Sequence, residues 1–209
     1  MDIKERIQKI LRILRKGYPD AKTPLTHKNP LQLLIATILS AQCTDERVNK
    51  ITPALFAKYK SAADFARAKQ PELEKIIHSA GFYKSKAKNI IGCCKNLVEK
   101  HSSEVPKSLE ELIKLPGVGR KTTNVVLGAV WNVPGVVVDT HVKRLTYRMG
   151  LTKNTGPEKI EQDIMKLLPD KDWNDFSICV VFHGRRVCVA RKPACGACKI
   201  AELCPKIGV

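Results

Sequence analysis

Apolar residues recur at helical spacing along most of the chain, and this pattern predicts an all-α fold. Residues 31–43 are apolar on nearly every side, which predicts a buried central helix. The only strand-like run, Val136-Val137-Val138, is too isolated to found a sheet. Further helices are predicted at 62–68, 71–79, 84–100, 140–149, 157–168 and 173–186. A first amphipathic helix ends at Gly17-Tyr18-Pro19, and its apolar face is Ile3, Ile7, Ile10, Leu11 and Leu14.

The segment from Ser108 to His141 contains a predicted helix, tight hairpin and second helix. Ser108 is a good N-cap for an apolar-periodic run, and Pro116 stops that run. Gly117 and Gly119 allow a turn that residues with a Cβ atom resist. The backbone N–H groups of residues 117–121 should then face outward at a helix N-terminus, where they could bind a phosphate.

Lys121 follows this turn and is a candidate nucleophile. The positive end of the helix dipole and the neighbouring Arg120 both disfavour its ammonium form. A partly neutral lysine can attack a carbonyl carbon. The alternative is an ordinary solvated surface charge.

The sequence also contains an internal repeat with a spacing of 36 residues. Residues 73–81 resemble residues 109–117, and the match continues from Ile90-Ile91-Gly92 to Val126-Leu127-Gly128. Two helix–hairpin–helix units in tandem are therefore expected. Phe82 and Tyr83 stand at the first hairpin and could wedge into a base stack, although both could equally be ordinary core aromatics.

Composition indicates a globular protein with a polyanionic partner. The 209 residues are 44% hydrophobic, and 37 basic against 20 acidic residues give a net charge of +17. No basic amphipathic helix with aromatic anchors points to a membrane surface, and no apolar run is long enough to span a bilayer. We therefore expect a soluble intracellular protein whose eight cysteines are thiols or metal ligands.

Four cysteines near the C-terminus form a candidate metal site. Cys188, Cys195, Cys198 and Cys204 have the spacing C-x6-C-x2-C-x5-C. Zinc sites usually have two C-x2-C pairs, so this uneven spacing favours a 4Fe–4S cluster while leaving zinc as the alternative. Arg191 and Lys192, in the loop between two of these cysteines, should face outward as phosphate contacts. The remaining cysteines, predicted to be buried thiols, are Cys43, Cys93, Cys94 and Cys179.

Asp139 follows the valine run and opens a predicted helix. Its simplest role is that of an N-cap. A capping carboxylate at a cleft edge could also stabilise positive charge on an anomeric carbon or activate an attacking group.

Together these motifs resemble the endonuclease III family of helix–hairpin–helix DNA glycosylases. The likeness rests on residues 115–122, residues 138–142 and the cysteine tail, and it extends to residues 33–42 and 81–87. It implies a six-helix barrel domain at 23–133 that contains the hairpin, and a 4Fe–4S cluster domain at 1–22 and 134–209. A DNA-binding cleft would lie between these two helical domains.

The resemblance also implies roles for individual residues. Lys121 would attack C1′ of a flipped nucleotide and form a Schiff base, and Asp139 would be the essential carboxylate. The substrate would be duplex DNA with oxidised pyrimidines or abasic sites, bound by a monomeric, cytoplasmic, nucleoid-associated protein of prokaryotic type. Expected DNA contacts are Gln42, Phe82, Gly117, Gly119, Arg120, His141, Arg191 and Lys192.

Two other functions are compatible with the sequence. One is a single-function glycosylase for mismatched or alkylated bases, and the presence of Lys121 argues against it. The other is a DNA-binding module without catalysis, in which hairpins contact phosphates and the metal loop is a scaffold.

Overall fold

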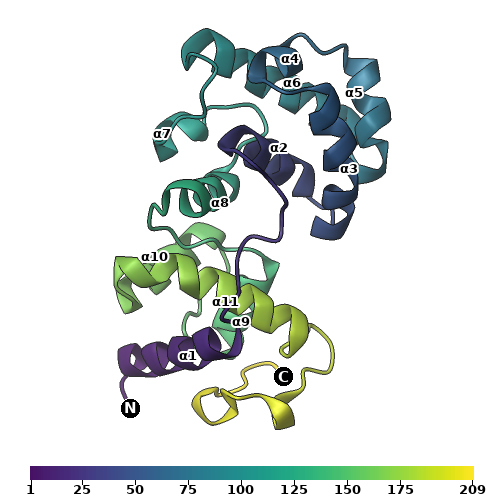
Figure 1. Cartoon of the computed structure of the whole chain (residues 1–209). Helices are drawn as coiled ribbons and strands as arrows, with labels where there is room; N and C mark the ends of the chain where they lie inside the picture. Colours follow the sequence, from purple (N-terminus) through teal and green to yellow (C-terminus); the bar gives the residue numbers. More distant parts are fainter. The chain divides into compact units, whose positions relative to one another are not determined.

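The computed structural model describes all 209 residues, and every regular element in it is helical (Figure 1). Val136, Val137 and Val138 form no strand, in agreement with the sequence-based prediction that this isolated run founds no sheet. The all-α prediction is confirmed. The chain divides into two compact units, one of residues 23–131 and one of residues 1–22 and 132–209.

The unit at 23–131 is built around α2, which packs against α3, α6 and α8. Asn29 caps α2 by accepting the N–H of Gln32, Pro30 occupies its first turn, and residues 33–39 are all buried. The predicted central helix is therefore present, but it ends at Ser40 and not at Cys43. The helices of this unit are α2 (Pro30–Ser40), α3 (Asp45–Lys58), α4 (Ala62–Ala66), α5 (Gln70–Ile77), η1 (His78–Ala80), α6 (Tyr83–Lys100), α7 (Leu109–Leu112) and α8 (Arg120–Trp131).

Two helix pairs in this unit correspond to the sequence repeat. In the first, α5 and η1 lead into α6; in the second, α7 leads into α8. The turn glycines Gly81 and Gly117 lie 36 positions apart, and both have positive φ, +67° and +75°. The two units thus share the conformation of the turn glycine, while the next position differs, because Phe82 has a φ of +48° and Val118 has no positive φ.

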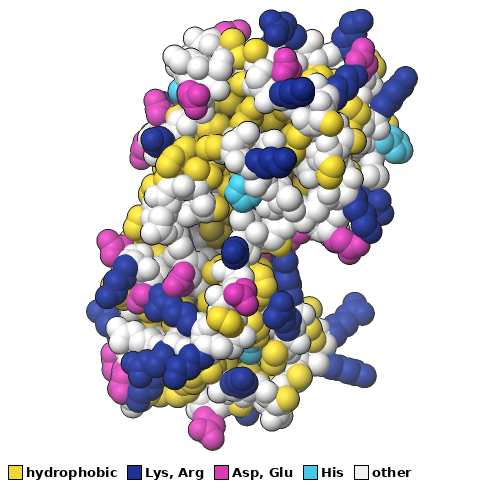
Figure 2. All heavy atoms as spheres, in the orientation of Figure 1, with side chains coloured by type: hydrophobic (Ala, Val, Ile, Leu, Met, Phe, Trp, Pro, Cys, Tyr) yellow, Lys and Arg dark blue, Asp and Glu magenta, His cyan; other side chains and the backbone are white.

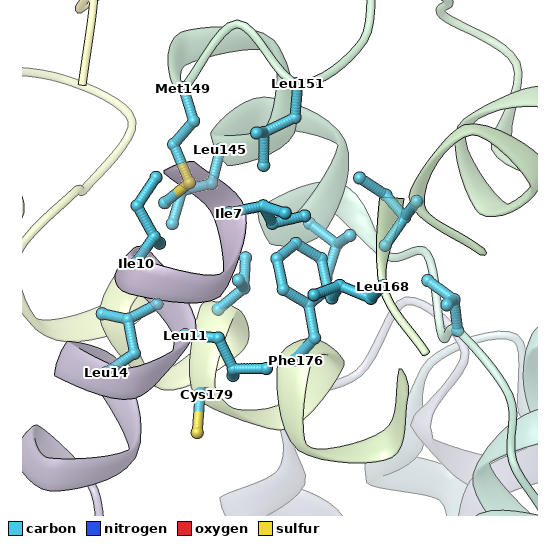
Figure 3. Packing of buried hydrophobic residues seen from close by; sticks show 14 of the residues in the cluster. Ile7, Ile10, Leu11, Leu14, Leu145, Met149, Leu151, Leu168, Phe176 and Cys179 are labelled. Carbon is cyan, nitrogen blue, oxygen red and sulfur yellow. The ribbon is translucent and has the colours of Figure 1, made fainter. Parts of the chain in front are cut away.

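The unit that contains both chain ends has a continuous apolar core. In it α1 packs against α11 and α10, and α9 packs against α11. Figure 3 shows side chains of α1, including Ile7 and Leu11, meeting Phe176 of α11 and Leu145 of α9. The elements of this unit are α1 (Ile3–Gly17), α9 (Thr140–Arg148), α10 (Pro157–Leu167), η2 (Asp170–Asp172), α11 (Trp173–Arg186), η3 (Cys195–Ala197) and η4 (Ala201–Leu203).

Candidate functional site

The second hairpin packs closely against the side chain of Asn89. Ser108 caps α7 by accepting the N–H of Glu111, as predicted. The helix ends at Leu112, earlier than Pro116, and i→i+3 hydrogen bonds carry the chain through the turn to Val118. A Cβ atom on Gly117 would lie 2.7 Å from Cβ of Asn89 on α6. Glycine is therefore required here both for φ and for space.

Gly119 differs from Gly117, and the expectation that both glycines serve the turn is wrong in this respect. Its φ is not positive, and a Cβ atom built on it would meet nothing within 4 Å. The missing side chain is not explained by packing within the chain. It leaves open space beside the N-terminus of α8, where backbone N–H groups have no partner inside the helix. Such a position favours the approach of an anion.

Lys121 lies in the first turn of α8, and its side chain is exposed, as is that of Arg120. The amine is thus accessible from solvent. The hairpin backbone fixes the start of the helix that carries it, since Val118 is buried and donates to the carbonyl of Leu115 at 3.1 Å.

Asp139 is the N-cap of α9, as the sequence predicted. Its Oδ1 atom accepts the backbone N–H groups of His141 and Val142, both at 2.8 Å. These bonds fix the carboxylate relative to the helix and leave Oδ2 outside the cap. The residue is only partly buried.

His141 is held close to the same helix start. Its Nδ1 atom lies 3.2 Å from Nη2 of Arg144, and because a guanidinium only donates, Nδ1 is the acceptor. Burial lowers the pKa of His141; the charges of Arg144 and Arg185 act in the same direction, and Asp139 opposes them. Burial therefore favours the neutral form of the ring.

The four C-terminal cysteines line one cavity. Cys188, Cys195, Cys198 and Cys204 are among the residues that line a cavity partly open to solvent, and none of them forms a disulfide. No three His, Cys, Asp or Glu side chains of the chain converge closely enough to hold a single metal ion. A zinc ion needs all four sulfur atoms within about 2.3 Å of one point. Four thiols that line one cavity are the donor set that holds an iron–sulfur cube.

Part-buried hydrogen bonds hold the loops that carry these cysteines. Arg148, 8% exposed, donates to the carbonyls of Val189 and Ala190 at 2.8 and 2.9 Å and approaches Sγ of Cys188 at 3.3 Å. Sγ of Cys198 lies 3.4 Å from Nε2 of His183. Arg191 and Lys192 project from the loop into solvent, as expected, and Lys192 has a φ of +53°.

The other cysteines are mostly the buried thiols that the sequence predicts. Burial raises the pKa of Cys93 to about 12 and that of Cys179 to about 11, so both stay protonated. Cys94 is also buried. Cys43 is only half-buried, because α2 ends before it.

Gln42 and Phe82 occupy two exposed tips in the unit at 23–131. Both have positive φ, +51° and +48°, although neither is glycine. Phe82 is 66% exposed, whereas Val118, its counterpart in the repeat, is 5% exposed. Phe82 is thus a surface residue and not a core aromatic, while Tyr83 is half-buried against His78 with ring centroids 4.5 Å apart. Strained, exposed, non-glycine residues of this kind are concentrated at functional sites.

Two functionally placed residues, Lys86 and Arg148, are absent from the sequence-based candidates. Both are charged and buried. Lys86 lies on the apolar stripe of α6 with Ile90, Cys93 and Leu97, and Arg148 continues the stripe of Val142 and Leu145 on α9. In each case the sequence places a cation where the helical period predicts an apolar residue. This pattern could have identified both residues.

Lysine and arginine side chains are spread over the face of the molecule shown in Figure 2, with fewer acidic ones between them. None of the helices combines enough length and apolar character to cross a membrane.

Family models define the class of protein. Residues 35–170 match the model of HhH-GPD superfamily base excision DNA repair proteins, and residues 188–204 match that of the iron–sulfur binding domain of endonuclease III. The second match covers the four-cysteine loop.

Individual relatives define the family within this class. An endonuclease III of Synechocystis is 57% identical over 97% of this chain and 93% of its own length. A solved structure described as a trapped endonuclease III–DNA covalent intermediate is 42% identical, with a TM-score of 0.94, covering 99% of this chain and 97% of that one. A thermostable thymine-DNA glycosylase has the same fold (TM-score 0.88, covering 97% and 96%) at 22% identity.

The chain belongs to the endonuclease III family. It is a base excision repair enzyme of the DNA glycosylase and abasic-site lyase class, and its cofactor is a 4Fe–4S cluster. The resemblance inferred from the sequence motifs is confirmed.

Proposed function

We propose that this enzyme removes oxidised pyrimidines from duplex DNA and then cleaves the strand, with Lys121 as the nucleophile. The Nζ lone pair attacks C1′ of a flipped nucleotide as the bond to the base breaks, and the base leaves with the bonding electrons and takes up a proton. Opening of the sugar at C1′–O4′ gives a Schiff base. Loss of a C2′ proton then expels the 3′ phosphate by β-elimination.

The observation that carries this proposal is the exposed amine of Lys121 on the first turn of α8, in a chain of the endonuclease III family. A solvated amine can reach a sugar that has been rotated out of the stack. The related protein in the trapped covalent complex is joined to its DNA, which supports a covalent intermediate here as well.

Asp139 is proposed as the carboxylate that stabilises positive charge on the anomeric carbon as the base leaves. Its cap bonds involve Oδ1, so Oδ2 is available for this purpose. The fixed geometry costs no reorganisation at the moment of reaction.

The enzyme is proposed to bind double-stranded DNA by two kinds of contact. Gln42 and Phe82 would enter the duplex where the base has left, because both are exposed on strained tips. The contacts to the backbone and the flipped nucleotide would come from Gly117, Gly119, Arg120, His141, Arg191 and Lys192.

We assign Cys188, Cys195, Cys198 and Cys204 as the cluster ligands, because these four thiols line one cavity. The cluster would hold the loop of Arg191 and Lys192 in place and would take no part in the chemical steps. We also propose domain boundaries at 22/23 and 133/134, a monomeric state and a cytoplasmic, nucleoid-associated location.

Borohydride trapping tests the role of Lys121. Reaction with a duplex that contains one oxidised pyrimidine should give a covalent protein–DNA adduct, and Lys121→Gln should abolish it. The matched control is Lys114→Gln, which removes an exposed lysine from the same hairpin and should trap as wild type does. Base release without any trapped adduct would refute the Schiff base and favour a single-function glycosylase.

A further inference from the structure

Lys86 is a buried lysine without an acidic partner. Its side chain is 5% exposed, and its Nζ atom donates to the carbonyls of Leu39 at 2.8 Å and Ala80 at 2.7 Å. Burial lowers the pKa of Lys86, so the fold disfavours the charge that it places there. Burying an amine that bonds only to backbone oxygens costs more free energy than burying an apolar side chain at the same position.

The two carbonyls lie at the ends of two helices. Leu39 is in the last turn of α2 and Ala80 is the last residue of η1, so one ammonium group binds both C-terminal ends, where a cation is favoured. Because one nitrogen bonds both oxygens, the two chain segments lie next to each other on α6, which also packs against α2 (Figure 1).

Each of these segments leads directly to an exposed tip. Gln42 follows Leu39 by three residues, and Phe82 follows Ala80 by two. Both tips have left-handed backbone conformations, which persist only where the surroundings enforce them. Lys86 is the side chain that bonds to both tip segments.

We propose that Lys86 is a positioning residue that holds the Gln42 and Phe82 tips at the spacing needed for both to enter the duplex at one lesion. This inference rests on the proposed function, in which these tips replace the extruded nucleotide in the stack. Lys86 touches neither DNA nor the reacting atoms, and it acts through the backbone of the two tips.

The test compares Lys86→Met with a control on the same helix, Lys88→Met, which removes an exposed lysine. The readouts are single-turnover base release from a lesion duplex and fluorescence of 2-aminopurine placed opposite the lesion. Lys86→Met should slow base release by about tenfold or more and weaken the fluorescence rise that reports unstacking. Lys88→Met should match wild type in both.

A double-mutant cycle separates positioning from a general loss of structure. In a Gln42→Ala/Phe82→Ala background the tips are gone, so adding Lys86→Met should change the rate by less than about twofold. A loss as large as in the wild-type background would overturn the proposal, as would wild-type behaviour of Lys86→Met. Lys86→Gln keeps a neutral NH₂ donor group on a shorter side chain and should be intermediate. If both Lys86 variants fail to fold, Lys86 is a core-stability residue and the proposal is wrong.

Trapping on a short single-stranded abasic oligonucleotide distinguishes this inference from the proposed function. That substrate has no stack to enter, so Lys86→Met should trap as wild type does. If the wild-type enzyme is not trapped, the Lys121 chemistry itself fails. If the wild-type enzyme is trapped but Lys86→Met slows base release equally with and without the Gln42 and Phe82 side chains, only the proposed role of Lys86 is wrong.

Discussion

Asp139 combines a structural and a chemical role that one substitution can separate. Its Oδ1 atom accepts two backbone N–H groups at the start of α9. Asparagine caps a helix as well as aspartate does, since its side-chain oxygen can accept the same bonds. What asparagine lacks is the negative charge.

Asp139→Asn should therefore keep the fold and lose the chemistry. We expect the unfolding free energy to change by less than about 1 kcal/mol, mainly through the lost helix-dipole interaction. The base-release rate should fall roughly a hundredfold or more. Thermal unfolding and single-turnover kinetics measure the two effects. A near-normal rate would show that Asp139 is only a cap.

Substitutions at Gly117 and Gly119 should separate an effect on stability from an effect on DNA binding. Gly117→Ala places a Cβ atom at positive φ and 2.7 Å from Asn89, and should cost about 1–3 kcal/mol of stability. Gly119→Ala meets no atom of the chain and should cost less than about 0.5 kcal/mol. Its Cβ would instead occupy the space open to a phosphate, so duplex affinity should drop. Unchanged affinity would show that no phosphate lies beside Gly119.

At the scale of elements, the four-cysteine loop depends on Arg148 of α9. Its guanidinium donates to two loop carbonyls from a buried position. Arg148 uses Nη1 for one carbonyl and Nη2 for the other, and a lysine lacks this planar two-nitrogen geometry, so at least one of the two part-buried bonds should be weakened. We expect Arg148→Lys to lower iron and acid-labile sulfide per chain and to speed bleaching in air. Arg191→Lys, an exposed change in the same loop, should retain wild-type iron content; equal content in both variants would contradict this role of Arg148.

Helix positions follow from local patterns in this chain, but turns and buried cations do not. The helix at 173–186 was predicted with its observed bounds, because its apolar period and flanking residues are local signals. By contrast, α7 was expected to continue to Pro116 but ends at Leu112. Hydrogen bonds between residues three apart replace the α-helical bonds between residues four apart before Pro116 is reached. The repeat predicted an aromatic hairpin tip, but only three-dimensional packing determines that Phe82 is exposed while Val118 is buried.

At the scale of the whole molecule, the sequence order hides how the chain is assembled. The helix α1 packs with α10 and α11, so residues from both ends of the chain form one compact unit, and the residues between them in sequence form the other. Apolar periodicity predicts α1 but says nothing about its distant partners, and only the family resemblance implied this arrangement. Lys86 was missed for the same reason, since its two carbonyl partners come from α2 and η1.

The net charge of +17 predicts a strong dependence of DNA binding on salt. Each phosphate that a lysine or arginine neutralises releases counterions, so the logarithm of the binding constant should fall against the logarithm of salt concentration with a slope of about −0.9 per phosphate. Replacing Arg191 and Lys192 together with glutamine should make the slope shallower by about 0.9 for each phosphate that is no longer neutralised. Lys9→Gln, which removes one lysine paired with Glu5, is the control for the loss of a positive charge outside this loop. Because phosphate contacts do not depend on the base sequence, the slope for undamaged duplex should become shallower by the same amount. An unchanged slope would show that Arg191 and Lys192 do not contact DNA phosphates.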